Sequence, residues 1–326
     1  MKAVVMGYHT MGCVGFDALL RHGFEIPAVF THRDDPHEEV WWESLAARAE
    51  ARRIPVHYPE SLKDSRWVET VRGYAPDFIF SFYFRFMIPV SILELPPRGA
   101  LNLHGSLLPR YRGRAPVNWV LVNGETETGV SLHYMVAKPD AGNLVDQERV
   151  SIAFEETART LYAKLEAAAT ALLDRTLPRL KAGTAHSSPL DLTVGSYFGG
   201  RKPEDGRVDW RWPALRVYNL VRAVTHPYPG AFTTLGGRKV FLWWGLPETD
   251  LAADGAGVER RGPEGGSARV VPAPGAVLSV DAGGVRVSAG QGALNLLRCQ
   301  TEGGPELEAA AWAASEGVAP GTVLGT

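Results

Sequence analysis

The first half of the chain alternates between two hydrophobic periodicities, and this alternation constrains the fold more than any other feature. Short apolar runs typical of buried strands alternate with segments whose apolar residues recur at helical spacing. The expected strands are residues 3–6, 26–30, 55–57 and 78–82, and the expected helices are residues 16–22, 39–52 and 67–74. Because strands that alternate with helices usually pair in parallel, the pattern predicts a Rossmann-like α/β domain, a parallel sheet with helices on both faces. Ligands in such folds bind beyond the carboxyl ends of the strands.

The second half changes character after one long helix. We expect this helix to run from Thr157, its N-cap, to Lys181, and Gly183 supplies the stop. Residues 187–205 then shift to Ser, Gly, Pro and Lys, a composition typical of a linker.

Beyond the linker, a run of short strands predicts a second, smaller domain. The expected strands are residues 230–235, 240–244, 275–280, 284–288 and 293–297. Gly236-Gly237 and Gly283-Gly284 lie between strands and indicate hairpin turns. Short strands at this spacing predict a small antiparallel β-barrel of OB-like type. The predicted division is a catalytic domain at 1–186, a linker at 187–205 and a C-terminal domain at 206–326, with a flexible inserted loop at 252–273.

The composition argues against several classes of protein. The formal net charge of the 326 residues is −2, so no global charge attracts nucleic acid or an anionic membrane. Cys13 and Cys299 lie at opposite ends of the chain, which gives neither a disulfide framework nor a metal-binding spacing. The first residues lack the features of a signal peptide, and no apolar run approaches the roughly 20 residues of a membrane span. We therefore expect a soluble cytoplasmic protein without a metal.

The segment that begins at Asn102 carries the residues best suited to catalysis. Asn102 and His104 are two residues apart, so on an extended strand both side chains point to the same face. The amide of an Asn can hold a developing oxyanion while a His takes a proton from an attacking nucleophile. Ser106 follows, but the GxSxG pattern of serine hydrolases is absent around it.

Two neighbouring features have a structural and a functional interpretation. Arg110, Arg112 and Arg114 alternate along one loop, which is either solvated charge or a grip for an anion. Asp140 opens the sequence Asp-Ala-Gly between two expected strands, where an Asp commonly serves only to form a turn.

Taken together, these motifs resemble the folate-dependent formyltransferase family. The resemblance is carried by Asn-x-His-x-Ser-Leu-Leu-Pro at 102–109, Arg-Gly-x-x-Pro at 112–116 and Asp-Ala-Gly at 140–142. Residues 221–223, 227–232 and 320–325 are similar to the family's carboxyl-terminal domain. The family includes methionyl-tRNA formyltransferase, glycinamide ribonucleotide transformylase and the sugar N-formyltransferases.

Within this family the chain is most similar to the formyltransferase domain of ArnA, a bifunctional enzyme of lipid A modification and polymyxin resistance. The matching segments are residues 8–13, 30–32, 104–109, 111–116 and 118–129. That domain formylates UDP-4-amino-4-deoxy-L-arabinose. The sequence departs from ArnA in ending after the formyltransferase region, without the dehydrogenase/decarboxylase half. Whether a separate decarboxylase supplies the substrate therefore stays open.

The resemblance implies a role for each catalytic candidate. His104 would be the general base or proton shuttle for the attacking amine, Asn102 would stabilise the tetrahedral oxyanion, and Asp140 would hold His104 in position. The one-carbon donor would be 10-formyltetrahydrofolate. Its binding residues would be Phe86, Met87, Ile88, Arg114, Val136, Ala137, Lys138, Pro139 and Asp140.

The identity of the acceptor separates the remaining alternatives. A UDP-linked amino sugar is the acceptor that the ArnA likeness implies, and another nucleotide-linked amino sugar or methionyl-tRNA is the alternative. Residues 33–43 carry five carboxylates and one Arg, which would repel a tRNA acceptor stem. A non-catalytic binding protein and a formyltetrahydrofolate hydrolase are further alternatives. The sequence leaves open the particular amino sugar, the oligomeric state and the part that the C-terminal domain takes in substrate binding.

Overall fold

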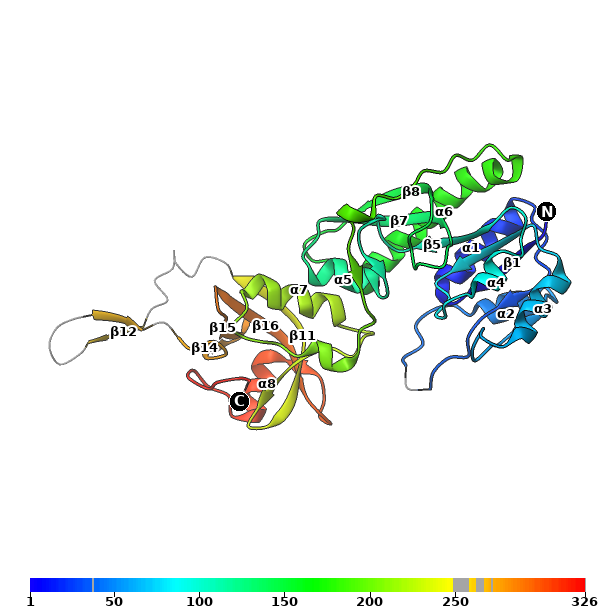
Figure 1. Ribbon diagram of the computed structural model, residues 1–326. Coiled ribbons are helices and arrows are strands. Elements are labelled where there is room, and N and C mark those ends of the chain that lie inside the picture. Colours follow the sequence, from blue (N-terminus) through cyan, green and yellow to red (C-terminus); the bar gives the residue numbers. More distant parts are fainter. Residues whose placement is uncertain (37, 249–257, 262–266, 271, 326) are drawn as a thin grey trace. The chain divides into compact units, whose positions relative to one another are not determined.

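The computed structural model describes residues 1–36, 38–248, 258–261, 267–270 and 272–325 (Figure 1). Contacts within the chain divide it into two compact units. The first unit consists of Met1–Val117, Thr126–Phe154 and Thr160–Gly200, and the second of Asn118–Glu125, Glu155–Arg159 and Arg201–Thr326. Residues 187–200 of the predicted linker thus belong to the first unit. Among the described residues, no helix is both long and apolar enough to cross a membrane.

The first unit is built on a seven-stranded sheet with the strand order β3-β2-β1-β4-β5-β7-β8. Its strands are β1 (Ala3–Gly7), β2 (Val29–Phe30), β3 (Val56–His57), β4 (Phe78–Phe82), β5 (Ala100–His104), β7 (Glu127–Tyr134) and β8 (Leu144–Ser151). The first five of these pair in parallel, which confirms the predicted Rossmann-like α/β class. The last two are antiparallel: β7 pairs with β5, and β8 pairs with β7 at the edge of the sheet (Figure 1). The segment 135–143 between β7 and β8 is too short for the helical crossover that a parallel pair would need.

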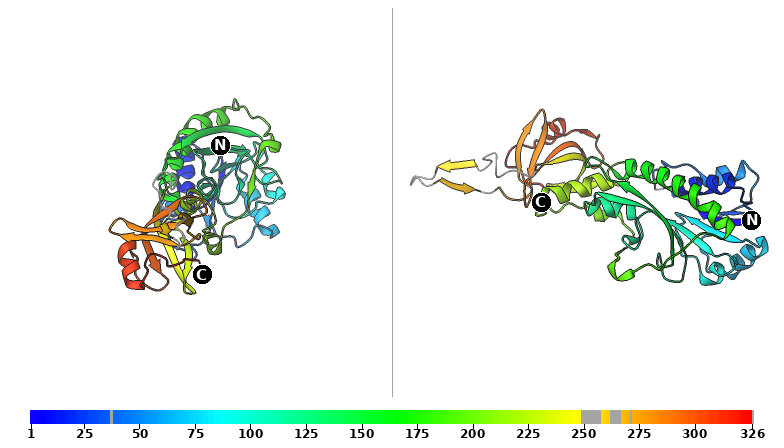
Figure 2. Two further views of the ribbon diagram at one scale, coloured as in Figure 1. Left: turned by 90° about the vertical axis from the view of Figure 1, so that its left-hand side faces the viewer. Right: turned by 90° about the horizontal axis from the view of Figure 1, so that it is seen from above.

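Helices cover both faces of this sheet. The helices α1 (His9–Arg21) and α6 (Ala158–Ala182) lie side by side on one face, where Asp174 bonds both Arg21, at 2.7 Å, and His22, at 2.9 Å (Figure 2). The helices α3 (Ser65–Tyr74) and α4 (Val90–Leu93) lie on the other. Their buried residues join those of the strands in one core cluster: Val4, Met6, Ala28, Phe30, Leu62, Val71, Ile79, Ile88, Ile92, Leu93 and Ala100. Burial of this apolar surface fixes the sheet from which the site residues project.

Two helices begin at other residues than their hydrophobic pattern predicts. The helix α1 begins at His9 rather than residue 16, because glycines in its first turns let it pack closely on the sheet; a Cβ at Gly15 would lie 2.4 Å from the ring of Phe82. The helix α2 (Leu45–Glu50) begins six residues later than the predicted start at Glu39. The side chain of Ser44 caps it by accepting a hydrogen bond from the Ala47 N–H at 3.2 Å.

The segment predicted as a linker has secondary structure of its own. It contains the 3₁₀ helices η1 (Leu192–Val194) and η2 (Pro203–Gly206) and the strand β9 (Tyr197–Phe198). The strand β9 pairs with β6 (Arg112–Gly113), within the loop that follows the predicted catalytic strand. Its composition predicted a linker, but the backbone of this segment completes a two-stranded sheet.

The second unit contains an antiparallel sheet, as predicted for the C-terminal domain. Its strands are β10 (Ala231–Leu235), β11 (Arg238–Glu248), β14 (Val277–Asp281), β15 (Gly284–Ser288), β16 (Ala293–Thr301) and β17 (Leu307–Glu308). The helices α7 (Ala214–Val224) and α8 (Ala309–Glu316) pack on this sheet, and the strand pattern did not predict them. The remaining helix, α5 (Pro116–Val122), begins in the last two residues of Met1–Val117, the first of the three segments that make up the first unit.

The predicted flexible loop at 252–273 lies largely outside the described residues. Within it, β12 (Val258–Arg261) and β13 (Ser267–Val270) form an antiparallel pair.

Candidate active site

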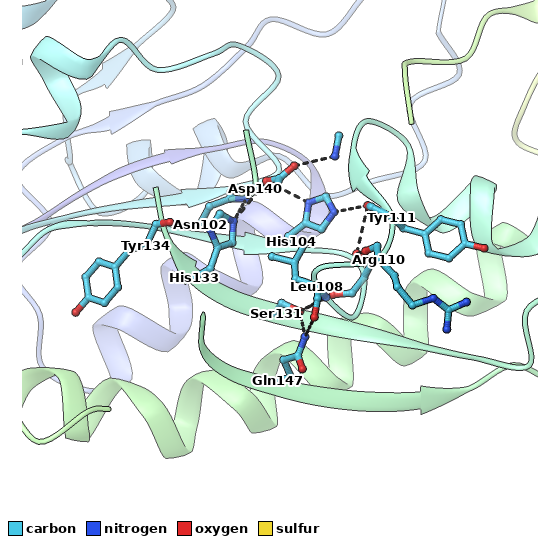
Figure 3. Close-up of polar contacts among 12 residues, drawn as sticks. Asn102, His104, Leu108, Arg110, Tyr111, Ser131, His133, Tyr134, Asp140 and Gln147 are labelled. Carbon is cyan, nitrogen blue, oxygen red and sulfur yellow. Dashed lines mark hydrogen bonds and ion pairs between the residues drawn. The ribbon is translucent and has the colours of Figure 1, made fainter. Parts of the chain in front are cut away.

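Two of the predicted catalytic residues project from β5, the strand next to β4 in the sheet. Asn102 and His104 are two residues apart on this strand, and their side chains approach the same group of polar residues (Figure 3). His104 is buried, with 6% of its surface exposed, and Asn102 is half-buried. The period-two prediction that places both side chains together is therefore met by the structure.

The third predicted residue, Asp140, comes to the same place from the segment between β7 and β8. Its Oδ1 atom lies 3.6 Å from His104 Nδ1 and 3.4 Å from Asn102 Nδ2. Its Oδ2 atom accepts a hydrogen bond from the Gly113 N–H at 2.8 Å. Asp140 has a φ of +47°, a conformation that non-glycine residues rarely adopt. Asp140 therefore does more than form a turn, since its carboxylate joins β5 to the loop that contains Gly113.

The ring of His104 is held from both sides. Its Nε2 atom lies 2.8 Å from the carbonyl oxygen of Tyr111. A carbonyl oxygen only accepts hydrogen bonds, so Nε2 carries a hydrogen and Nδ1, which faces Asp140, is the nitrogen that can take up a proton. Tyr111 has a φ of +57°, and this conformation is part of the loop that presents its carbonyl to His104.

Ser106 has a structural role in this loop. It is fully buried, and its hydroxyl donates to the carbonyl oxygens of Arg110, at 2.7 Å, and Tyr111, at 3.3 Å. The Ser131 hydroxyl in turn donates to the Ser106 carbonyl at 2.6 Å. These bonds hold the loop against β7, and they direct the Ser106 hydroxyl hydrogen to carbonyl oxygens rather than to the His that a serine nucleophile would need.

The electrostatics of the site favour an ionised Asp140. Burial by itself would raise the pKa of this carboxyl group. The charge of His104 and the Gly113 N–H, joined by the hydrogen bond and charge of His133 when that ring is protonated, outweigh burial and hold the pKa well below its ordinary range. A buried carboxylate that stays negative can stabilise a positive imidazole beside it.

The loop that carries Gly113 depends on the absence of a side chain there. Gly113 has a φ of +99°, and a Cβ on it would lie 2.2 Å from the carbonyl oxygen of Phe198 in β9. Its neighbour Arg112 is 8% exposed, and the Arg112 Nε atom is buried without a hydrogen-bond partner in the described part of the chain. Arg114, by contrast, is exposed. The alternating arginines therefore do not form one solvated stripe.

Apart from Arg114, the residues that the resemblance implies for folate binding occupy two segments. Phe86, Met87 and Ile88 follow β4, and residues 136–140 follow β7. Phe86, Met87, Val136, Ala137 and Lys138 are exposed, Pro139 is half-buried, and Ile88 is buried. Ile88 belongs to the core cluster of the sheet, and Met135, next to Val136, packs on that cluster. Exposed apolar side chains on a buried base suit a flat aromatic ligand, and their role in binding folate stays a prediction.

One residue of the site, His133, was not predicted. It lies on β7 directly opposite Asn102, is 1% exposed, and places Nε2 at 3.2 Å from Asn102 Nδ2 and 3.4 Å from Asp140 Oδ1. Its sequence neighbours on β7 are apolar or small, so nothing local distinguished it from a core histidine. The register between β5 and β7 would have been needed to find it.

The acidic segment at 33–43 is partly neutralised by its surroundings. Asp34 accepts a hydrogen bond from the Tyr8 hydroxyl at 2.7 Å, and Glu38 accepts one from Arg85 at 2.7 Å. The Arg85 guanidinium also lies over the Tyr8 ring, 4.6 Å from its centroid, which is within cation–π range. Arg48 also bonds Glu43, so at least three of the five carboxylates have partners within the protein.

No arrangement for a metal is present in the described residues: they contain no group of three or more His, Cys, Asp or Glu side chains that could hold an ion. The polar groups of the site are instead an amide, two imidazoles and a carboxylate. Such a set can bind an oxyanion and move a proton.

The fold resembles solved structures of transferases that act on small molecules. An N-formyltransferase from Helicobacter canadensis in complex with folinic acid and dTDP-3-aminofucose matches with a TM-score of 0.62 and 18% identity, over 91% of this chain and 99% of that chain. WlaRD, a sugar 3N-formyl transferase determined with dTDP and 5-N-formyl-THF, matches with a TM-score of 0.65 and 17% identity, over 94% and 99%.

The structure of HypX from Aquifex aeolicus in complex with tetrahydrofolic acid is also similar, although the HypX chain is longer. It matches with a TM-score of 0.61 and 18% identity over 97% of this chain, and the chain spans about half of its length, 47%. At these identities the likeness concerns the fold.

Two family models match the sequence directly. The model described as formyl transferase matches residues 17–177, which include Asn102, His104 and Asp140. The model described as the formyl transferase C-terminal domain matches residues 201–317. The two matches follow one another in the order of the two predicted domains and together cover most of the sequence, so the chain belongs to the formyl transferase family.

Proposed function

We propose that the chain is a folate-dependent N-formyltransferase that transfers the formyl group of 10-formyltetrahydrofolate to the amine of a nucleotide-linked amino sugar. The observation that carries this proposal is the convergence of Asn102, His104 and Asp140 in a member of the formyl transferase family. The three come from two separate segments, and their amide, imidazole and carboxylate are the groups that formyl transfer to an amine requires.

The geometry supports a specific path for the proton. The neutral amine of the acceptor attacks the formyl carbon and forms a C–N bond, while the carbonyl electrons move to its oxygen. The Asn102 amide donates to this oxyanion, and the proton of the attacking nitrogen passes to His104 Nδ1, beside the Asp140 carboxylate. The intermediate collapses by breaking the bond to N10 of the folate, and N10 takes the proton from His104 as tetrahydrofolate leaves.

The expected rate effects follow from these roles. A placed general base contributes about 10²- to 10⁴-fold, and one oxyanion donor about 10²- to 10³-fold. We therefore expect His104→Ala and Asn102→Ala each to lower kcat by about two orders of magnitude or more while the protein stays folded. Near-normal turnover in a folded His104→Ala protein would sink the assignment.

The acceptor that we propose first is UDP-4-amino-4-deoxy-L-arabinose, formylated at its 4-amine. The support is the likeness to the ArnA domain at residues 8–13, 104–109, 111–116 and 118–129. The product would then serve lipid A modification and polymyxin resistance. Two structural relatives were determined with dTDP or with dTDP-3-aminofucose, which supports a nucleotide-linked amino sugar as the broader class.

Methionyl-tRNA is the alternative acceptor. The acidic segment at 33–43 argues less strongly against it than its composition suggests, because Asp34 and Glu38 are bonded within the protein. The net charge of −2 still gives no excess of positive charge for the tRNA backbone. A small acceptor therefore remains the proposal.

The deciding experiment combines the purified protein with 10-formyltetrahydrofolate and UDP-4-amino-4-deoxy-L-arabinose and detects the formamido product by mass. Product in the wild type and its loss in His104→Ala support both the chemistry and the acceptor. Turnover only with a dTDP-linked amino sugar or methionyl-tRNA keeps the chemistry and replaces the acceptor. Formate release without any amine would point to a hydrolase instead.

A further inference from the structure

The side chain of His133 makes three polar contacts inside the site, and their chemistry restricts the state of its ring. Nδ1 lies 2.8 Å from the carbonyl oxygen of Tyr134, the next residue along β7. Because a carbonyl oxygen can only accept, this contact places a hydrogen on Nδ1. In the neutral ring Nε2 is then an acceptor, and the side chain beside it, at 3.2 Å, is the Asn102 amide nitrogen.

These contacts also set the direction of the Asn102 amide. An amide nitrogen has two hydrogens, and the bond to His133 Nε2 uses one of them. The other is donated to Asp140 Oδ1 over a longer distance, 3.4 Å, so this weaker bond is the one that an oxyanion would replace. The terminal side-chain torsion of asparagine has a broad distribution of angles, so without an anchor the amide group of Asn102 would not keep one orientation. The cross-strand register of β5 and β7, which pairs Asn102 with His133, keeps the two together.

We propose that His133 is a positioning residue for the transfer reaction: its neutral ring, anchored on the Tyr134 carbonyl, accepts one amide hydrogen of Asn102 and thereby aims the other at the oxyanion. This inference rests on the proposed function, since it assigns a partner to the oxyanion donor. His133 does not contact the reacting atoms in this role. It acts through Asn102.

The charged form of His133 would undo this arrangement. A hydrogen on Nε2 would face the Asn102 amide hydrogen, and two donors cannot form a hydrogen bond. The protonated Nε2 would instead donate to Asp140 Oδ1, at 3.4 Å. Among the described residues, the titratable groups that face His133 are Asp140 and, across the same carboxylate oxygen, His104. The competent state is therefore the one with Nε2 unprotonated.

The test is a mutant cycle on kcat and KM. His133→Leu removes the acceptor, and we expect kcat to fall about 10- to 10²-fold while the KM values for folate and acceptor change less than threefold, because the oxyanion forms only in the transition state. His133→Gln offers a side-chain oxygen to Asn102 and should recover most of kcat. In an Asn102→Ala background, His133→Leu should cost less than a further threefold. His57→Gln, the same substitution on β3 away from the site, serves as the control.

Two outcomes would overturn the proposal. A purely structural role would lower kcat equally in the wild-type and Asn102→Ala backgrounds and would give no recovery with His133→Gln. A ¹⁵N NMR spectrum of the protein alone, at neutral pH, should show His133 with Nδ1 protonated and Nε2 unprotonated, and a ring protonated on both nitrogens would refute the state that we infer. The NMR result does not depend on substrate, so its failure is distinguishable from a failure of the proposed function.

Discussion

Replacement of Gly113 by Ala tests how far the site depends on its supporting loop. The φ of +99° is unfavourable for any residue with a side chain, and the new Cβ would lie 2.2 Å from the Phe198 carbonyl oxygen. The obstacle is a backbone atom of β9, so no side-chain rotation relieves it. Either β6 separates from β9 or the Gly113 backbone turns, and both movements take the Gly113 N–H away from Asp140.

The size of the effect follows from the bond that is lost. A hydrogen bond to a charged group contributes about 1.5–3 kcal/mol, and about 1.4 kcal/mol corresponds to a tenfold change in rate. If the loss falls on the position of Asp140, kcat/KM should drop about 10- to 150-fold. Backbone strain should lower the free energy of unfolding by about 1–3 kcal/mol, which is smaller than the stability of most domains.

The assay measures tetrahydrofolate formed from 10-formyltetrahydrofolate in the presence of the acceptor, with urea unfolding followed by circular dichroism. Gly199→Ala is the matched control, because it lies one residue beyond β9 and a Cβ there meets no atom within 4 Å. Full activity in a folded Gly113→Ala protein, equal to that of Gly199→Ala, would refute the view that this N–H supports Asp140.

Two further predictions concern stability. The pKa of Asp140 is depressed in the folded protein, so its carboxylate contributes stability above the unfolded pKa of about 4, and this contribution is lost as pH falls through the folded value. Asp140→Asn should therefore lower the free energy of unfolding at pH 7, and this free energy should then decline less steeply as the pH falls. Urea unfolding at several pH values measures both effects, and the same acid decline in wild type and variant would contradict the reasoning. Ser44→Ala should lower the free energy of unfolding by about 1 kcal/mol, because Ser44 caps α2 by accepting from the Ala47 N–H. Ser44→Asp should retain the cap. Equal urea midpoints for wild type and Ser44→Ala would contradict this prediction.

Local patterns along the sequence determined the elements of the fold and half of the site. The alternation of apolar runs with helical spacing identified the strands β1 to β4 of the first unit, because periodicities of two and 3.6 residues are properties of adjacent residues. The same period of two placed Asn102 and His104 on one face of β5. Capping was less visible: the residue pattern predicted a helix start at Glu39, while in the structure the helix begins at Leu45, after the Ser44 cap.

The tertiary structure decided how these elements meet. Asp140 reaches Asn102 across 38 residues, and His133 faces Asn102 only because β7 runs antiparallel to β5 in one particular register. The segment 187–205 resembles a linker in composition, yet it supplies β9, which holds the loop of Gly113. Sheet register is a choice between distant strands, and a shift by one residue would turn His133 to the other face. Local residue patterns therefore indicated the chemistry of the site, and the pairing of distant strands determined its geometry.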